Sequence, residues 1–397
     1  FTNLGQVDIW GGSKTNSITG LLVNFGTIQN GDGTNHGRIR VDHGNAIVGT
    51  DGSVLSLEKG SEIVVNGKYK AAGYAANSSV TSRSADTAPS GENYGIVGIS
   101  DTNPITYNGT DNSVSIKHED GVIYVEGDQA TGIYARNNNN ADASKVVIEY
   151  TNSTAGTTGI DVRNNNAQNE GDSKGVGIAL VNGTGSTNGG TLNLTGSSTG
   201  ALASYASDAT TVKASESDTK AANDPDLTLS LGGNDIATGK NGIGVYAEDA
   251  EINVGSDKFT IETKDNGVGL WGMDNTTVAR GTTGKTFQYN YNGAKDKNGF
   301  AMAFGGKRIG ATTATNYMDI KFTNQGGTPT TIVGLQTPTR TKGTDAGIVG
   351  MLVNTNDDND LVVNKGKIEE DQNLSKTSLR AYGALVNNGI FENHGDI

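Results

Sequence analysis

An alternating aromatic run in the last third of the chain offers the most direct binding chemistry. Phe287, Tyr289 and Tyr291 are each separated by one residue, so in a β-strand their rings share one face. If that face is outward, Tyr289 and Tyr291 form a platform on which sugar rings could stack, with Lys307 and Arg308 nearby on a following loop. If that face is inward, the rings are core residues. Tyr289, Tyr291, Lys307 and Arg308 are therefore the candidate binding residues, and the choice of face stays open.

The densest acidic cluster is the run 356–360, Asn-Asp-Asp-Asn-Asp. It lies between two apolar segments, 348–353 and 361–363, which predicts a turn. Adventitious calcium binding and a catalytic acid pair are the alternatives. The sequence contains no zinc-type ligand spacing, no phosphate-binding loop and no convincing Ser-His-Asp arrangement. We therefore expect no catalytic residues, no cofactor and no metal site.

The elements that would position these residues follow from one repeated pattern, a glycine followed by an alternating apolar run. Clear copies occupy 20–23, 132–135, 159–162, 177–180, 242–247, 267–271, 299–303, 347–351 and 383–386. A strand repeated at similar spacing is the signature of a solenoid, in which each coil buries its inner face against the next. Ile243 is expected to face the core. Trp271, which ends another of these runs, has the same inward-or-outward ambiguity as the tyrosines.

Each coil is expected to carry two or three strands. Further alternating segments lie at 54–57, 113–116, 145–150, 192–194, 227–231, 259–262 and 319–322. Corners between strands are marked by Asn-x-Gly-x-Ile at 24–28, 364–368 and 393–397, where Asn and Gly tolerate left-handed backbone angles. The glycine starts predict roughly 13 to 17 coils, stacked at the ~4.8 Å spacing of strands.

The spacing between glycine starts is uneven, which predicts loop insertions on a single continuous β-solenoid over 1–397. The candidate insertions are 75–93, 136–144, 163–174, 204–225, 278–298, 305–316 and 336–345. In solenoids such insertions map to loops on a face and are either solvated connections or parts of a binding surface. The predicted architecture is all-β: a right-handed parallel β-helix with loop insertions.

Composition and charge restrict the function classes. The chain has 397 residues, 58 Gly, 5 Pro and no Cys, and its formal net charge is −13. A disulfide framework is excluded, and the acidic balance disfavours nucleic acid and acidic membranes as partners. No apolar stretch is long enough to span a membrane, so we expect no direct membrane insertion by this segment. Both ends fall within the repeat, and we therefore expect a segment of a longer rod.

Three motifs resemble one family. The runs Gly-Ile-Gly-Val-Tyr-Ala at 242–247, Gly-Val-Gly-Leu-Trp at 267–271 and Leu-Val-Asn-Asn-Gly-Ile-Phe-Glu-Asn at 385–393 resemble passengers of very large type V autotransporter adhesins. The Asn-rich, Cys-free style is most similar to the RadD-like outer-membrane autotransporters of fusobacteria. The resemblance covers essentially the whole chain and implies a right-handed β-helix displayed on the bacterial surface, anchored in the outer membrane through a C-terminal barrel that this segment lacks.

The resemblance implies an adhesin that binds host-cell glycans or receptor ectodomains, including immune receptors, or that mediates coaggregation with other bacteria through their surface proteins. The leading hypothesis is a rigid rod that presents binding loops and carries out no chemistry. A purely structural stalk is the main alternative. A β-helical polysaccharide lyase or hydrolase is the less favoured one, and it would require acids converging on one outer groove beside aromatic rings.

Overall fold

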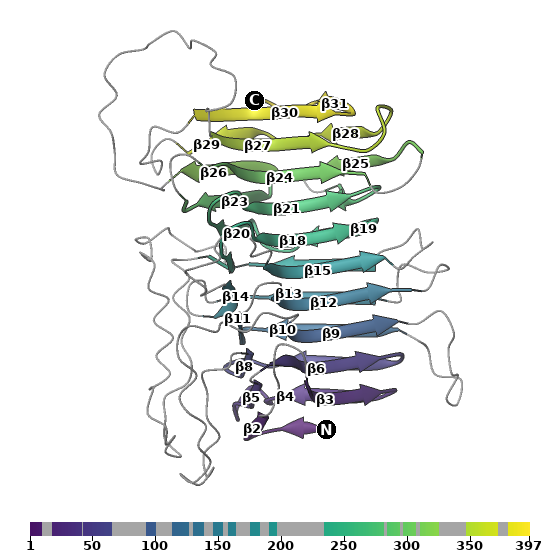
Figure 1. The fold of residues 1–397 in the computed structure, drawn as a ribbon, viewed down its shortest axis with the longest axis vertical. Coiled ribbons are helices and arrows are strands. Elements are labelled where there is room, and N and C mark those ends of the chain that lie inside the picture. The colour runs from purple at the N-terminus through teal and green to yellow at the C-terminus, as the bar shows by residue number, and fades with distance from the viewer. Residues whose placement is uncertain are drawn as a thin grey trace.

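The chain folds as a right-handed parallel β-helix in which every coil passes through three sheets (Figure 1). The computed structural model describes residues 1–9, 18–41, 43–65, 93–100, 113–126, 130–138, 146–153, 158–163, 175–182, 190–196, 234–281, 284–293, 297–306, 310–324, 347–371 and 380–397. Within these ranges all strand pairs are parallel, and no helix is long and apolar enough to cross a membrane. The predicted all-β parallel solenoid is confirmed.

The three sheets run the length of the rod and pair their strands in chain order. The first sheet consists of β1 (Thr2–Asn3), β4 (Thr27–Asn30), β7 (Ser53–Leu57), β10 (Val114–Glu119), β13 (Val146–Thr151), β16 (Gly190–Thr195), β19 (Ala250–Val254), β22 (Thr277–Val278), β25 (Thr313–Asn316), β28 (Leu361–Asn364) and β31 (Ile390–Asn393). The second sheet consists of β2 (Gln6–Ile9), β5 (Arg38–Val41), β8 (Glu62–Val65), β11 (Val122–Glu126), β14 (Gly159–Arg163), β17 (Ile236–Thr238), β20 (Lys258–Thr263), β23 (Thr286–Tyr291), β26 (Asp319–Asn324) and β29 (Ile368–Glu370). The third sheet consists of β3 (Ile18–Asn24), β6 (Gly44–Thr50), β9 (Tyr94–Ser100), β12 (Thr131–Asn137), β15 (Val176–Asn182), β18 (Ile243–Glu248), β21 (Val268–Met273), β24 (Gly299–Gly305), β27 (Gly347–Asn354) and β30 (Arg380–Asn388).

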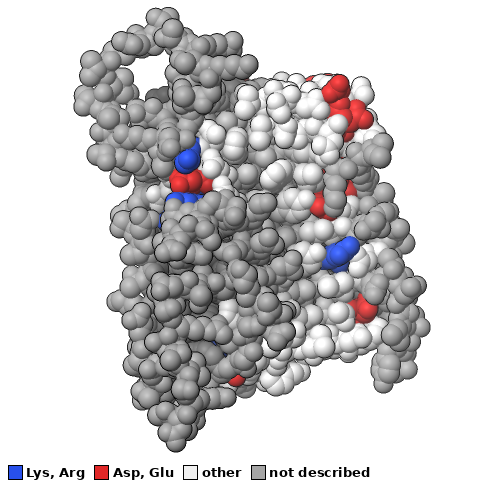
Figure 2. Space-filling view, viewed as in Figure 1, with Lys and Arg blue, Asp and Glu red and all other residues white. Residues whose placement is uncertain are grey.

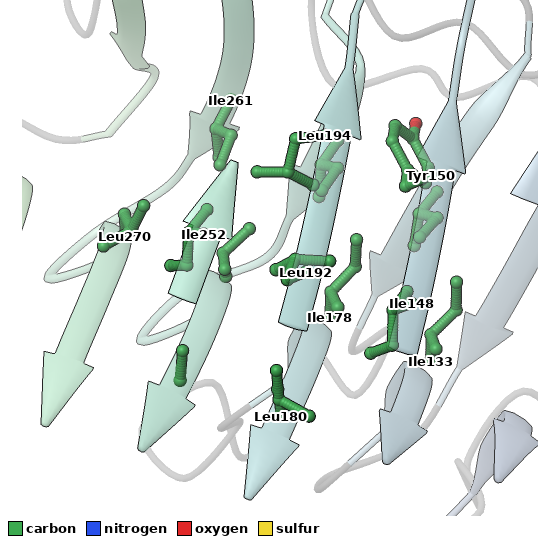
Figure 3. Packing of buried hydrophobic residues seen from close by; sticks show 14 of the residues in the cluster. Ile133, Ile148, Tyr150, Ile178, Leu180, Leu192, Leu194, Ile252, Ile261 and Leu270 are labelled. Carbon is green, nitrogen blue, oxygen red and sulfur yellow. The ribbon is translucent and has the colours of Figure 1, made fainter. Parts of the chain in front are cut away.

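The core is a set of apolar columns inside the helix, each built from register-aligned residues of successive coils. In the third sheet, Ile133, Ile178, Val245 and Leu270 are aligned, and none is more than 1% exposed. Figure 3 shows Ile133, Ile178 and Leu270 pointing into the space that first-sheet residues such as Ile148 and Leu192 also enter. Burying these side chains stabilises the rod by roughly 1.5–3 kcal/mol each, which a narrow core needs because each coil contributes few of them.

Ile243 does not face the core, and the prediction that it does is wrong. Val245 is fully buried, whereas Ile243 lies on the outer side of β18 and keeps partial exposure. Gly244, Val245 and Ala247 occupy the inner positions of this strand. Val245 and Ala247 are fully buried, and a Cβ added at Gly244 would point at Ile261 of the second sheet. A local irregularity at the glycine therefore reverses the side that simple alternation from Ile243 predicts.

The described strands form fewer coils than expected. The third sheet has ten strands, and β6 pairs directly with β9 and β15 with β18, so no coil lies between those partners. The estimate of roughly 13 to 17 coils counted glycines such as Gly159, which begins the second-sheet strand β14 and opens no new coil.

Two predicted insertions contain strands of the solenoid itself. The range 278–298 contains β23, and the range 305–316 contains β25, so neither is wholly a loop. The range 136–144 begins inside β12. The ranges 75–93, 163–174, 204–225 and 336–345 fall outside the described residues, apart from single residues at the boundaries of the first two.

An asparagine ladder holds one corner of the helix between the first and second sheets. The fully buried Asn364 donates from Nδ2 to Asn393 Oδ1 at 2.7 Å and to the Gly366 carbonyl at 2.6 Å, and its Oδ1 accepts from Asn316 Nδ2 at 2.8 Å. Gly366 is required because a Cβ there would overlap the Met318 carbonyl oxygen. The Asn-x-Gly-x-Ile motif at 364–368 is thus a structural corner, as predicted, although its asparagine acts through its side chain. At 24–28 the same motif marks a different corner, where Phe25 adopts the positive φ of 53°.

Replacing Asn364 with alanine should lower the free energy of unfolding by about 2–4 kcal/mol, because it leaves Asn316 Nδ2 and the Gly366 carbonyl short of partners in a buried corner. The urea midpoint, followed by circular dichroism, measures this loss. The matched control is Asn393→Ala, which removes the exposed end of the same ladder and should cost less than half as much. Equal losses for both variants would show that the ladder does not act through burial.

Candidate functional site

The predicted aromatic platform lies inside the core. Phe287, Tyr289 and Tyr291 are at most 1% exposed, aligned between β20 and β26 of the second sheet. The Tyr289 hydroxyl donates to the Gly267 carbonyl at 3.0 Å and accepts from Thr263 Oγ1 at 2.7 Å. Burial raises the pKa of Tyr289, so this hydroxyl stays protonated.

The outward interpretation of Tyr289 and Tyr291 is therefore wrong, and the inward one is confirmed. Their hydroxyls satisfy backbone carbonyls of the corner toward the third sheet, Tyr291 donating to Lys297 O at 3.1 Å. Lys307 and Arg308, the other two candidates, lie outside the described residues.

The acidic run 356–360 is a turn between β27 and β28, as predicted. Asp360 is 1% exposed, and its carboxylate accepts from the backbone nitrogens of Thr312 and Asp357 and from the Thr312 hydroxyl. Asp357 accepts from the backbone and side-chain nitrogens of Asn359, and these bonds lower its pKa. The carboxylates of Asp357 and Asp360 are used by the turn. Among the described residues, no group of three or more His, Cys, Asp or Glu side chains is arranged to hold a metal ion.

The outer face of the third sheet is the feature that sequence reasoning missed. Outward positions of the first sheet are mostly polar, as in β10, where Ser115, Lys117 and Glu119 point away from the core, with exceptions such as Val54. Several third-sheet strands are apolar on both sides: β21 reads Val-Gly-Leu-Trp-Gly-Met and β24 reads Gly-Phe-Ala-Met-Ala-Phe-Gly. Such two-sided apolar strands normally belong to sheets that are covered on both faces.

The strand register aligns these outward residues into three columns, which we call the apolar strip. The central column consists of Leu22, Val48, Val97, Tyr134, Ala179, Tyr246, Trp271, Ala303, Leu352 and Leu385. The column before it consists of Thr19, Asn45, Tyr94, Thr131, Val176, Ile243, Val268, Phe300, Val349 and Tyr382, and the column after it contains Asn24, Thr50, Ile99, Arg136, Val181, Glu248, Met273, Gly305, Asn354 and Asn388. The central column is apolar throughout, whereas the two flanking columns also contain polar residues. Where described residues reach the surface over these strands, most are neither acidic nor basic (Figure 2).

Exposure of the strip varies along the rod. Side chains in the middle coils flank one another and are buried or half-buried, with Tyr134, Tyr246 and Trp271 among the half-buried ones. Toward the two ends Leu22 is 69%, Leu385 46% and Tyr382 38% exposed. Val97, Ala179 and Ala303 of the central column are buried, so the exposed apolar area lies mainly at the ends and at the half-buried aromatic residues between them. Exposed apolar side chains that gather on one face commonly mark an interaction site.

Two aromatic pairs define the relief of the strip. Tyr94 and Tyr134 meet edge to face with ring centroids 5.5 Å apart, and Tyr246 and Trp271 do so at 6.3 Å. The Tyr246 hydroxyl donates to Glu248 Oε1 at 2.6 Å. The pKa of Tyr246 is raised, mainly by burial and to a lesser extent by this hydrogen bond. The two pairs therefore present ring edges and faces rather than charges.

Two donors on the strip have no acceptor within the described part of the chain, Trp271 Nε1 and Arg136 Nε. The indole nitrogen lies over Gly305, where a Cβ would be 3.2 Å from it, so the glycine leaves room for the ring. Glu248 is 2% exposed and accepts from the Tyr246 hydroxyl and, at 3.2 Å, from the Asn182 backbone. Burial of apolar surface, with a few polar groups to fix orientation, is the chemistry this arrangement supports.

Comparisons with protein-family models, with curated proteins and with solved structures found no match. The sequence does hold one signal for the strip. Runs such as Gly-Ile-Gly-Val-Tyr-Ala have apolar residues at both odd and even positions, whereas first-sheet segments such as 113–116 alternate between polar and apolar residues. Trp271, whose orientation the sequence left open, is an outward member of the strip.

Proposed function

We propose that this chain is a rigid segment of a bacterial cell-surface adhesin of the large autotransporter type, and that the apolar strip is its contact surface. The observation that carries the proposal is the continuous apolar column that crosses all ten third-sheet strands on the outer face of the rod. The ligands are those that the sequence resemblance implies: a host-cell glycan, a receptor ectodomain such as that of an immune receptor, or a surface protein of another bacterium.

The architecture supports adhesion by geometry. Backbone hydrogen bonds run along the rod between successive coils, so the outward side chains are held at fixed spacing on a stiff support. Repetition of similar contacts along one face raises the effective affinity of weak individual contacts. The candidate loops at 75–93, 163–174, 204–225 and 336–345 would add to this surface, because loops displayed on a rigid support often carry binding residues.

Replacing Trp271 with alanine should weaken ligand binding at least about 30-fold, because a large aromatic side chain near the middle of an interface is the typical hot spot. The measurement is binding of the purified segment to a glycan array and to a panel of receptor ectodomains. The control is Val54→Ala, which truncates a 43% exposed side chain on the outer face of the first sheet and should leave binding unchanged.

Two outcomes would contradict the proposal. Saturable binding that survives Trp271→Ala, with both variants folded by circular dichroism, would move the contact surface away from the strip. A folded segment that binds neither glycans nor ectodomains nor the surface of partner bacteria would support the stalk alternative.

A further inference from the structure

We infer that the ligand of the apolar strip is an acidic oligosaccharide, whose carboxylate or sulfate binds Arg136 and whose sugar rings contact the aromatic side chains beside it. This inference rests on the proposed function, since it names the ligand class of the same contact surface. It starts from the two donors of the strip that have no acceptor in the described part of the chain, at Arg136 and Trp271. Both residues are half-buried, so part of each side chain meets solvent.

Arg136 has no carboxylate partner among the described residues, unlike the buried Arg40 of the second sheet. Arg40 is 6% exposed, and its Nε donates to Glu62 Oε1 at 3.1 Å. Arg136 Nε is also shielded from water, yet no acceptor within the described ranges meets it. Its aligned neighbours are Ile99 on β9 and Val181 on β15, whose side chains carry no polar group. Such a guanidinium opposes folding, and an anion brought by a ligand would offset that cost.

The chemistry of the guanidinium selects an oxyanion on the ligand. Arginine binds carboxylate and similar groups through two parallel N–H bonds, and the Nε–H of Arg136 is available for one of them. The carboxylate of the same outward column, Glu248, lies two strands away on β18. It accepts from the Tyr246 hydroxyl at 2.6 Å and from the Asn182 backbone nitrogen at 3.2 Å. The anion for Arg136 is therefore expected from outside the protein.

The aromatic rings near Arg136 favour a sugar as the carrier of that anion. Tyr134 precedes Arg136 by two residues on the outer face of β12, and the central column continues from it to Tyr246 and Trp271. These three rings are half-buried, and apolar faces of sugar rings stack on such side chains. An acidic peptide is disfavoured, because strands from β12 to β21 are paired on both edges and cannot accept an added strand.

Trp271 Nε1 marks the far end of the expected contact. It lies on β21, three strands from β12, which corresponds to about 14 Å along the rod. A hydroxyl or ring oxygen of the ligand would accept the hydrogen bond that this nitrogen lacks within the described residues. One sugar ring cannot reach both Arg136 and Trp271, so the ligand is expected to be an oligosaccharide that runs along the rod axis.

Isothermal titration calorimetry of the purified segment tests the inference with three probes that share one core: lactose, sialyllactose and sulfated lactose. An acidic form should bind at least about ten-fold more tightly than lactose, and Arg136→Gln should abolish this preference. A preference for sialyllactose alone identifies a carboxylate as the anion, and one for sulfated lactose alone identifies a sulfate. The matched control is Arg280→Gln, which makes the same change at an exposed arginine after β22 and should keep the preference.

Arg136→Met separates a binding role from a structural one. If the arginine serves the ligand, an unbranched apolar side chain between Ile99 and Val181 should leave the thermal unfolding midpoint unchanged or higher. A lower midpoint would show that the fold itself stabilises the guanidinium, which would overturn the inference.

Three binding results would also overturn it: equal affinity for the three probes, no binding of any of them, or an acid preference that survives Arg136→Gln. A triglutamate peptide that binds as tightly as sialyllactose would overturn the choice of a sugar. If the probes fail while Trp271→Ala still weakens binding to a receptor ectodomain, the proposed function stands and only the acidic oligosaccharide is wrong.

Discussion

Replacing Val245 with aspartate should destabilise the middle of the rod by more than about 4 kcal/mol. Val245 is fully buried between Ile178 and Leu270 in the inner column of the third sheet. An aspartate there would bring an unpaired carboxylate into a site lined by aliphatic side chains, where neither water nor a cation can reach it. Hydrogen exchange should show lost protection in β15, β18 and β21, because in a solenoid each coil is supported by its neighbours.

Ile243→Asp is the matched variant, two residues away on the same strand and of the same chemistry. Its side chain lies on the outer face and keeps partial contact with water, so the expected loss is about 1 kcal/mol. Thermal unfolding followed by circular dichroism compares the two. If Ile243→Asp proved as damaging as Val245→Asp, the assignment of inner and outer faces in the third sheet would be wrong, and the apolar strip with it.

This pair of residues shows how far the sequence determines the fold. The glycine-initiated repeats and the alternation in segments such as 113–116 are sufficient to predict parallel sheets and a narrow core. They cannot show which side of a strand such as 242–247 faces the core, because its apolar residues occur at both odd and even positions. The glycine at 244 places its own position and Val245 both inward, an irregularity that no period of two describes.

The candidate site was less predictable for the same reason. Alternation correctly placed Phe287, Tyr289 and Tyr291 on one face, but the intervening Gln288 and Asn290 are themselves buried polar residues, so polarity did not identify the side that faces water. The register of β23 against β20 and β26 decides it. The apolar strip likewise exists only after ten strands separated by irregular connections have been aligned.

His118 is a core residue that local sequence hides. It lies between Lys117 and Glu119, two charged residues, yet the register aligns it with Leu57 and Tyr150. Its ring is fully buried and stacked on that of Tyr150, with centroids 4.5 Å apart and planes at 16°. Nδ1 lies 3.2 Å from the Thr151 carbonyl, and Nε2 has no hydrogen-bond partner among the described residues. Burial, only partly opposed by the Thr151 contact and the charge of Asp120, lowers the pKa of His118 to about 4.

The rod should therefore lose stability on mild acidification through this one residue. In the unfolded chain the imidazole binds a proton near its ordinary pKa of 6.5, whereas in the folded chain it does so only near pH 4. Because the unfolded state binds more protons between these values, stability is complete above about pH 6.5 and falls by up to about 3 kcal/mol as the pH drops toward 4. His118→Leu, which places in β10 the residue type of the aligned Leu57 and Leu194, should remove this part of the pH dependence.

The measurement is the urea midpoint of wild type and His118→Leu at intervals from pH 7.5 to pH 4, compared as a difference so that carboxylates common to both proteins cancel. At pH 7.5 the variant should be at least as stable as the wild type, because it removes a buried nitrogen without a partner. Its advantage should then grow steadily below pH 6.5. Ser115→Ala changes an outward residue on the same strand. Its urea midpoint should differ from that of the wild type by the same amount at every pH. A constant difference between wild type and His118→Leu across the range would mean that the imidazole titrates alike in the folded and unfolded chains, and that the column around Tyr150 admits water.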